Sequence, residues 1–342
     1  MNDDRDQWRY RIFAGAAGLL VFALAYVNRT TFPFPWNDEA RFYLPALWWA
    51  EHGSLSPANI HAPSGIFWVP DGFTIFIGLA LRLFGETMQA ARGVCECAVA
   101  LGVTLFALGF RRLGGSWQAG AAATLLLLAP PVVFAANMVR MEAPLFLLIA
   151  VALLLHVHRH ALAASAVLFG SLLFHPALGI AAIGYAAIVC LLPGSLLPAR
   201  RASGRSIAAM DWGLVFVVAL CALGEVARIV HHWGLFEAHM MFQASQKLRV
   251  PLREKLMRPQ ALILLMSFAT VATLLWRRHV YPKLGDMRDI LPVAGIALGI
   301  LIYSVFGDEM LYDVYSLSVC PALAFCVICR DFGASAPNRL SS

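Results

Sequence analysis

The chain is short of charge: only 13% of its 342 residues are charged, whereas 60% are hydrophobic. An ordinary soluble domain is roughly half apolar and about a quarter charged. The composition therefore excludes a soluble domain and predicts a polytopic membrane protein. The formal net charge of +6 does not indicate nucleic-acid binding, because the arginines form short clusters between apolar runs and not a basic face.

The motifs of soluble enzymes are also missing. The sequence has no glycine-rich phosphate loop with lysine, no serine elbow and no histidine pair with a glutamate at metal spacing. These absences argue against hydrolases and nucleotide-driven enzymes. The seven cysteines lie in or beside apolar runs, where a thiol behaves as a small hydrophobe, so no disulfide framework is expected.

Apolar stretches recur along the whole chain, and several approach the roughly 17 to 25 residues that a membrane-spanning helix needs. They cover residues 12–27, 66–84, 92–110, 116–135, 143–157, 161–174, 178–193, 207–230, 259–276, 289–306 and 312–329. If 66–84 lies in the outer face and does not cross, the arginine clusters near 111, 159 and 200 fall in the cytoplasm, as positive charge prefers. The expected fold is an all-α polytopic membrane bundle with about ten crossings and both termini cytoplasmic.

An acidic pair follows the first apolar stretch, in the segment Trp36-Asn37-Asp38-Glu39-Ala40-Arg41-Phe42-Tyr43. Carboxylates beside a membrane are either solvated loop acids or members of a site. The surrounding aromatic residues favour a site, because they can pack the loop into a fixed structure. We therefore expect residues 28–91 to form a structured first extracytoplasmic loop, with Asp38, Glu39 and Arg41 as candidate site residues.

Further polar groups fall on the same side of the membrane in this topology. They are Arg140, Glu142, His175, Asp308, Glu309 and Asp313. Glu142 opens an apolar run, so it either caps a helix N-terminus, where the helix dipole favours its charge, or contributes to a site. Arg140 offers a planar fork that suits phosphate or carboxylate. His175 precedes a proline and either marks a simple turn or donates to a phosphate oxygen.

A second outer loop, residues 231–258, is basic although positive charge is disfavoured on that side. It contains Lys247, Arg249, Arg253, Lys255 and Arg258. These residues either meet lipid headgroups or bind an anionic ligand. Apolar residues recur every four positions from Phe236 to Leu248 and predict a helix along the bilayer surface. Just before this loop, Glu225 and Arg228 are three residues apart and could pair.

Taken in order and sidedness, these motifs resemble those of integral membrane glycosyltransferases that use polyprenyl-phosphate sugars. The motifs are the acidic pair after the first span, the aromatic and proline-bearing loop, Arg-x-Glu before a proline, and the His-Pro turn. These enzymes form the GT-C class, and the pattern is closest to family 39, the protein mannosyltransferase and aminoarabinose transferase type. The resemblance covers residues 12 to about 180. Glu142 departs from it, because Asp is common at that position.

The resemblance implies a GT-C-like bundle that moves a sugar from a polyprenyl-phosphate donor, with inversion, to an extracytoplasmic hydroxyl or amine of a lipid, glycan or protein. It makes Asp38 the catalytic first-loop acid, Glu39 its neighbour and Glu142 the second-loop acid. The chemistry agrees, since the acceptor needs a base and the departing phosphate needs cations, which Arg140 and the basic loop can supply. Carboxylates on two loops could also bind a divalent metal or act without one.

Two other functions stay open on the sequence alone. A transporter or flippase for a lipid-linked or anionic solute should show related halves or interrupted helices at mid-depth, and no convincing internal repeat is visible. A non-catalytic subunit that keeps the same fold is the other alternative. The first span follows three arginines and lacks a small-residue cleavage site, so it is expected to stay as an anchor, in a bacterial inner membrane with the active face extracytoplasmic.

Overall fold

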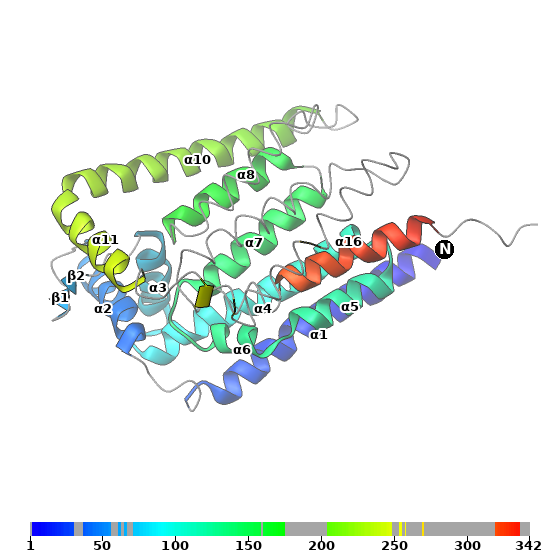
Figure 1. Cartoon of the computed structure of the whole chain (residues 1–342), viewed down its shortest axis with the longest axis horizontal. Coiled ribbons are helices and arrows are strands. Elements are labelled where there is room, and N and C mark those ends of the chain that lie inside the picture. The colour runs from blue at the N-terminus through cyan, green and yellow to red at the C-terminus, as the bar shows by residue number, and fades with distance from the viewer. Residues whose placement is uncertain are drawn as a thin grey trace, which may run out of the picture.

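The computed structural model describes residues 2–30, 37–55, 61–62, 65–66, 71–158, 160–174, 204–247 and 319–335, with the single positions 253, 254, 257 and 269. The described chain is a helical bundle (Figure 1). Its helices are α1 (Asn2–Asn28), α2 (Asn37–His52), α3 (Asp71–Phe84), α4 (Met88–Leu113), α5 (Trp117–Leu127), α6 (Pro130–Ala136), α7 (Glu142–Val157), α8 (Ala161–Gly170), the 3-10 turn η2 (Ser171–Leu173), α10 (Gly204–His231), α11 (Trp233–Lys247) and α16 (Cys320–Ser335). Two-residue strands β1 (His61–Ala62) and β2 (Gly65–Ile66) pair antiparallel.

Helix α4 is the centre of the bundle and packs most extensively against α1 and α7. Its inward side chains, among them Val99, Val103 and Phe106, are completely buried. The absence of a side chain at Gly102 allows close approach of α7, because a Cβ there would lie 2.6 Å from a ring carbon of Phe146. The rings of Phe106 and Phe146 meet edge to face with centroids 5.0 Å apart. Aromatic packing over a glycine therefore fixes α4 against α7.

Membrane-spanning character is confirmed, but the expected number of crossings is not reached. Three described helices are long and apolar enough to cross, namely residues Arg5–Asn28, Met88–Leu113 and Trp212–His231, and the pair α5 and α6, bent by 63°, could supply a fourth. The prediction of about ten crossings is corrected to three or four within the described residues. Helices α7 and α8 are too short to qualify by length, and the predicted spans 178–193 and 289–306 lie outside the described residues.

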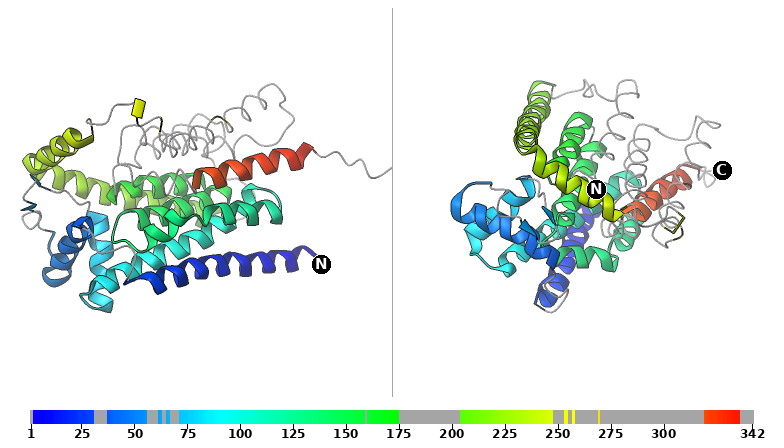
Figure 2. Two further views of the ribbon diagram at one scale, coloured as in Figure 1. Left: turned by 60° about the horizontal axis from the view of Figure 1, so that its bottom comes forward. Right: turned by 60° about the vertical axis from the view of Figure 1, so that its left-hand side comes forward.

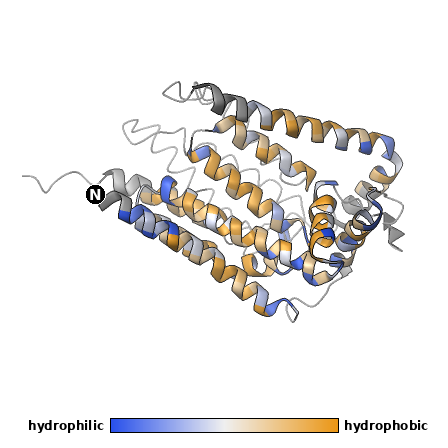
Figure 3. Ribbon diagram, turned by 180° about the vertical axis from the view of Figure 1, so that it is seen from behind, coloured by the Kyte–Doolittle hydropathy of each residue, from blue (hydrophilic) through white to orange (hydrophobic). Residues whose placement is uncertain are grey.

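Hydrophobic residues make up most of α7, α8 and α10, as the colouring of the ribbon in Figure 3 shows. Helix α10 leaves large apolar side chains exposed along its length, including Trp212, Phe216, Leu220 and Leu223. Exposed side chains of this kind suit contact with lipid, which is as apolar as they are. Lipid is therefore the environment that this face of the helix fits.

Helices α2 and α3 form a layer, with the strands and α11, at the end of the bundle opposite the N-terminus (Figures 1 and 2). The two helices run parallel, because Phe42 packs on Phe73 near their starts and Arg82 bonds to the carbonyl of Ala50 near their ends. Helix α3 has 14 residues and is about 21 Å long, short of the roughly 30 Å apolar thickness of a bilayer. It buries one face against α2 and leaves Leu83 exposed. The stretch 66–84 is therefore not among the candidate spans.

We expect the two ends of α4 to lie on opposite sides of the membrane, with the α2–α3 layer outside. Gln89 and Gln118 are both exposed, one at the start of α4 and the other just after the turn that ends it. In a background without Cys97 and Cys221, a membrane-impermeant maleimide should label Gln89→Cys in intact cells and Gln118→Cys only after lysis. Labelling of both from one side, or in the opposite sense, would overturn this topology.

Candidate functional site

A carboxylate near the start of α2 lies at the centre of a buried polar cluster. Glu39 is completely buried, and its two oxygens accept hydrogen bonds from Arg92 on α4, Nε to Oε1 at 3.1 Å and Nη2 to Oε2 at 2.6 Å. The backbone N–H of Val139, between α6 and α7, donates to Oε1 at 2.9 Å. A buried charge survives only when it is paired and hydrogen-bonded in this way. These three residues, the Glu39 cluster, join α2, α4 and the segment before α7.

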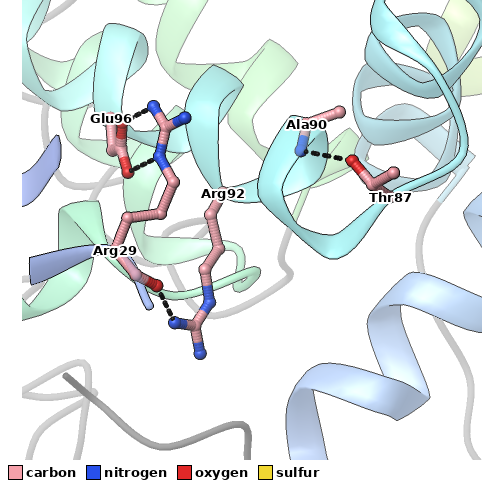
Figure 4. Close-up of polar contacts among 5 residues, drawn as sticks. All are labelled: Arg29, Thr87, Ala90, Arg92 and Glu96. Carbon is pink, nitrogen blue, oxygen red and sulfur yellow. Dashed lines mark hydrogen bonds and ion pairs between the residues drawn. The ribbon is translucent and has the colours of Figure 1, made fainter. Parts of the chain in front are cut away.

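The same arginine also joins the end of α1 to this cluster (Figure 4). Nη1 of Arg92 donates to the backbone oxygen of Arg29 at 2.6 Å, and Nε of Arg29 donates to Oε1 of Glu96 at 2.7 Å. A second contact joins Nη2 of Arg29 to Oε2 of Glu96. The hydrogen bond to Glu96 raises the pKa of Arg29, which keeps its charge. Arg92 and Glu96 are four residues apart, so both lie on the face of α4 that meets the end of α1.

A second ion pair comes from the segment that leads into α7. Nε of Arg140 lies 3.2 Å and 3.3 Å from the two oxygens of Glu142, and both side chains are buried. Glu142 is the first residue of α7, so the helix dipole favours its charge as well. The Arg140 guanidinium also lies over the ring of Phe42 on α2, 5.8 Å from its centroid. This pair therefore adjoins the first two turns of α2, where Glu39 is held.

Five of the predicted site residues lie at or near the start of α2. Glu39, Arg140 and Glu142 come together at the start of α2, although about a hundred residues separate Glu39 from the other two in sequence. Asp38 is the residue before Glu39 in α2, and Arg41 follows on the same helix, partly buried.

Of the remaining candidate site residues, Lys247 and Arg253 lie among the described residues. Lys247 ends α11 and Arg253 is exposed. His175 and Arg249 lie outside the described residues, as do Asp308, Glu309 and Asp313. The expected pairing of Glu225 with Arg228 is confirmed, since Nε and Nη2 of Arg228 donate to the two Glu225 oxygens at 3.0 and 2.8 Å.

Sequence reasoning missed the partners of these acids. Arg92, Glu96 and Arg29 were not singled out, although Arg92 and Glu96 lie in or beside an apolar stretch, where ionisable residues are rare and usually functional. Their spacing of four residues was the available signal for a shared helix face. Nothing in the sequence pairs Arg92 with Glu39, because they are 53 positions apart.

The described residues do not favour a metal at this site. Among them, no group of three or more histidine, cysteine or acidic side chains could hold a metal ion. Glu39 and Glu142 each already share their oxygens with an arginine. A cation at these carboxylates would compete with both guanidinium groups, so the donor set fits charge pairing better than metal binding.

Comparison with known proteins adds no family: no family model matches the chain, and neither a curated protein nor a solved structure shows significant similarity to it.

Proposed function

We propose that this protein is a membrane glycosyltransferase that uses a polyprenyl-phosphate sugar and acts at the end of the bundle formed by α2 and α3. The observation that supports this most is the Glu39 cluster, which ties the start of α2 to α4 and to the segment carrying Arg140 and Glu142. It brings the first-loop acids beside the second-loop Arg-x-Glu motif. This is the juxtaposition that transfer from a lipid phosphate requires, a base beside cations.

The proposed reaction is a single inverting displacement at the anomeric carbon. The acceptor oxygen or nitrogen forms a bond to this carbon while the bond to the donor's phosphate oxygen breaks, and its electron pair leaves with the polyprenyl phosphate. Asp38 takes the proton of the acceptor. Arg140 lies near the departing phosphate and offsets its growing negative charge, with Lys247, Arg249 and Arg253 as further cationic candidates from the sequence.

Glu39 has a positioning role in this proposal. Its two oxygens already accept three hydrogen bonds, from Arg92 and from Val139. Successive residues are offset by about 100° around a helix axis, so neighbouring residues of a helix project in different directions. Glu39 therefore holds the start of α2 while Asp38 performs the proton transfer, which separates the roles of the acidic pair.

The finer topology belongs to this proposal as well. We place the α2–α3 layer on the extracytoplasmic side of a bacterial inner membrane, because Arg111 and Arg112 end α4 at the opposite end of the bundle. The further crossings that would complete a GT-C-like bundle are assigned to apolar stretches beyond the described residues. The acceptor is a lipid, glycan or protein on the outer face.

The protein in lipid nanodiscs should release polyprenyl phosphate from polyprenyl-phosphate sugars when an extract of envelope lipids and glycans is supplied as acceptor. A panel of radiolabelled donor sugars, each on the same polyprenyl phosphate, would show label moving to a new product. A matched nucleotide sugar serves as the control and should give no transfer. Turnover from the nucleotide sugar alone would overturn the donor class, and movement of the intact donor across a liposome membrane without transfer would support a flippase instead.

A further inference from the structure

A second group of buried charges links α3 to α10 without belonging to the cluster around Glu39. Asp71, the first residue of α3, meets Arg228 near the end of α10, and Nε of Arg228 lies 2.6 Å from Oδ1 of Asp71. The same guanidinium donates to both oxygens of Glu225. The side chains of Asp71, Arg228 and Glu225 are only 20%, 14% and 12% exposed. Two carboxylates therefore face one arginine in a partly buried position.

Arg228 forms aligned hydrogen bonds with Glu225 but not with Oδ1 of Asp71. The N–H at Nε is directed to Glu225, so Oδ1 of Asp71 lies close to positive charge but is buried without an aligned hydrogen bond. If both carboxylates are ionised, two like charges lie close together in a poorly solvated position, which is unfavourable. One proton on Asp71 removes this repulsion and gives Asp71 an O–H that can donate to a neighbouring oxygen.

The pKa of Asp71 also favours a proton on this carboxylate. Burial is the largest cause and, together with Glu225, raises the pKa of Asp71 to about 7, while Arg228 opposes this rise without cancelling it. The neighbouring turn η2 (Ser171–Leu173) carries no ionisable side chain.

Helices α2 and α4 also pack on α3. Of their charged residues near this end, Glu39 and Arg92 are paired with each other, and Asp38 and Arg41 lie at the start of α2. The charged groups found to act on Asp71 both come from α10.

We propose that Asp71, Glu225 and Arg228 form a proton-linked latch that holds the outer-layer helix α3 against α10 when Asp71 is protonated and loosens it when the proton is lost. The direction follows from linkage. A carboxyl whose pKa is higher in the closed state binds more protons there, so closure is favoured in acid and weakens as the pH rises from about 4 to about 7. The latch does not rest on the proposed glycosyl transfer, and its test uses no sugar.

Hydrogen exchange of the full-length protein in nanodiscs tests the latch. After correction for the pH dependence of intrinsic exchange, the protection of amides in 71–84 should fall by up to about 50-fold between pH 5 and pH 7, the limit set by a pKa near 7 when closed and 3.8 when open. Asp71→Asn keeps the neutral form and should make protection independent of pH. Glu86→Gln, at an exposed carboxylate just after α3, is the matched control and should keep the wild-type profile.

Glu225→Gln tests the same titration if Asp71→Asn does not fold. In Glu225→Gln, a single carboxylate faces Arg228, so the loss of protection should shift to lower pH. Equal protection of wild-type α3 at pH 5 and pH 7 would overturn the latch. An unchanged profile in Asp71→Asn or in Glu225→Gln would also overturn it, because the titrating group would then lie elsewhere.

Discussion

Arg92→Met should destabilise the folded protein by about 3 to 5 kcal/mol, the range found when one partner of a buried ion pair is removed. The substitution keeps a long apolar side chain in α4 but removes the guanidinium that pairs with the buried carboxylate of Glu39, to which the Val139 N–H still donates. It also removes the hydrogen bond that Arg92 gives to the Arg29 carbonyl. Equilibrium unfolding in mixed micelles would measure the change.

Two comparisons make this expectation specific to the pair. Arg112→Met changes the same residue type at an exposed position on the same helix and should stay within about 0.5 kcal/mol of the wild type. Combining Arg92→Met with Glu39→Gln removes both charges and keeps an oxygen for the Val139 N–H. The double variant should recover most of the loss, as a coupled pair does in a double-mutant cycle. Equal stabilities of Arg92→Met and Arg112→Met would show that the pair contributes nothing.

The long helices could be predicted from the sequence, because a continuous apolar run needs no knowledge of its neighbours. The stretches at 12–27, 92–110 and 207–230 correspond to α1, α4 and α10. Glu142 at the start of α7 and the pairing of Glu225 with Arg228 could also be predicted, since both depend on local spacing along one helix.

The α2–α3 layer was harder to predict. The acidic pair was expected on a loop, but it lies near the start of α2, a helix that continues through Pro45 although proline removes a backbone donor. The parallel packing of α2 on α3 depends on Gly78, where a Cβ would collide with Trp49. A glycine in an apolar run does not by itself reveal which helix will approach it.

The charge partners were the least predictable part. Glu39 pairs with Arg92, 53 positions away, and Asp71 lies against Arg228, 157 positions away. These pairings follow from the packing of α2 and α3 on the bundle and not from any local pattern. As a result, the sequence identified Glu39 as a candidate catalytic acid, whereas its contacts support a positioning role.

Asp38→Asn should slow sugar transfer strongly while leaving donor binding intact. The substitution preserves shape and hydrogen-bonding capacity but removes the ability to accept a proton, so turnover should fall by the roughly 10² to 10⁴-fold that a general base contributes. Donor binding should persist, because it depends on the cations and not on this carboxylate. Transfer from a polyprenyl-phosphate sugar and donor affinity would be measured separately, on equal amounts of folded protein.

The control variants separate catalysis from folding. Glu51→Gln changes an exposed carboxylate on the same helix and should leave both turnover and stability unchanged. Glu39→Gln weakens the bonds to Arg92 and should lower stability, yet the molecules that remain folded should turn over far faster than Asp38→Asn. Glu39→Gln should therefore lower mainly stability, and Asp38→Asn mainly turnover, if Glu39 positions α2 and Asp38 takes the proton. Near-normal turnover by Asp38→Asn, or a loss in Glu39→Gln as deep per folded molecule, would contradict this division between the neighbouring carboxylates.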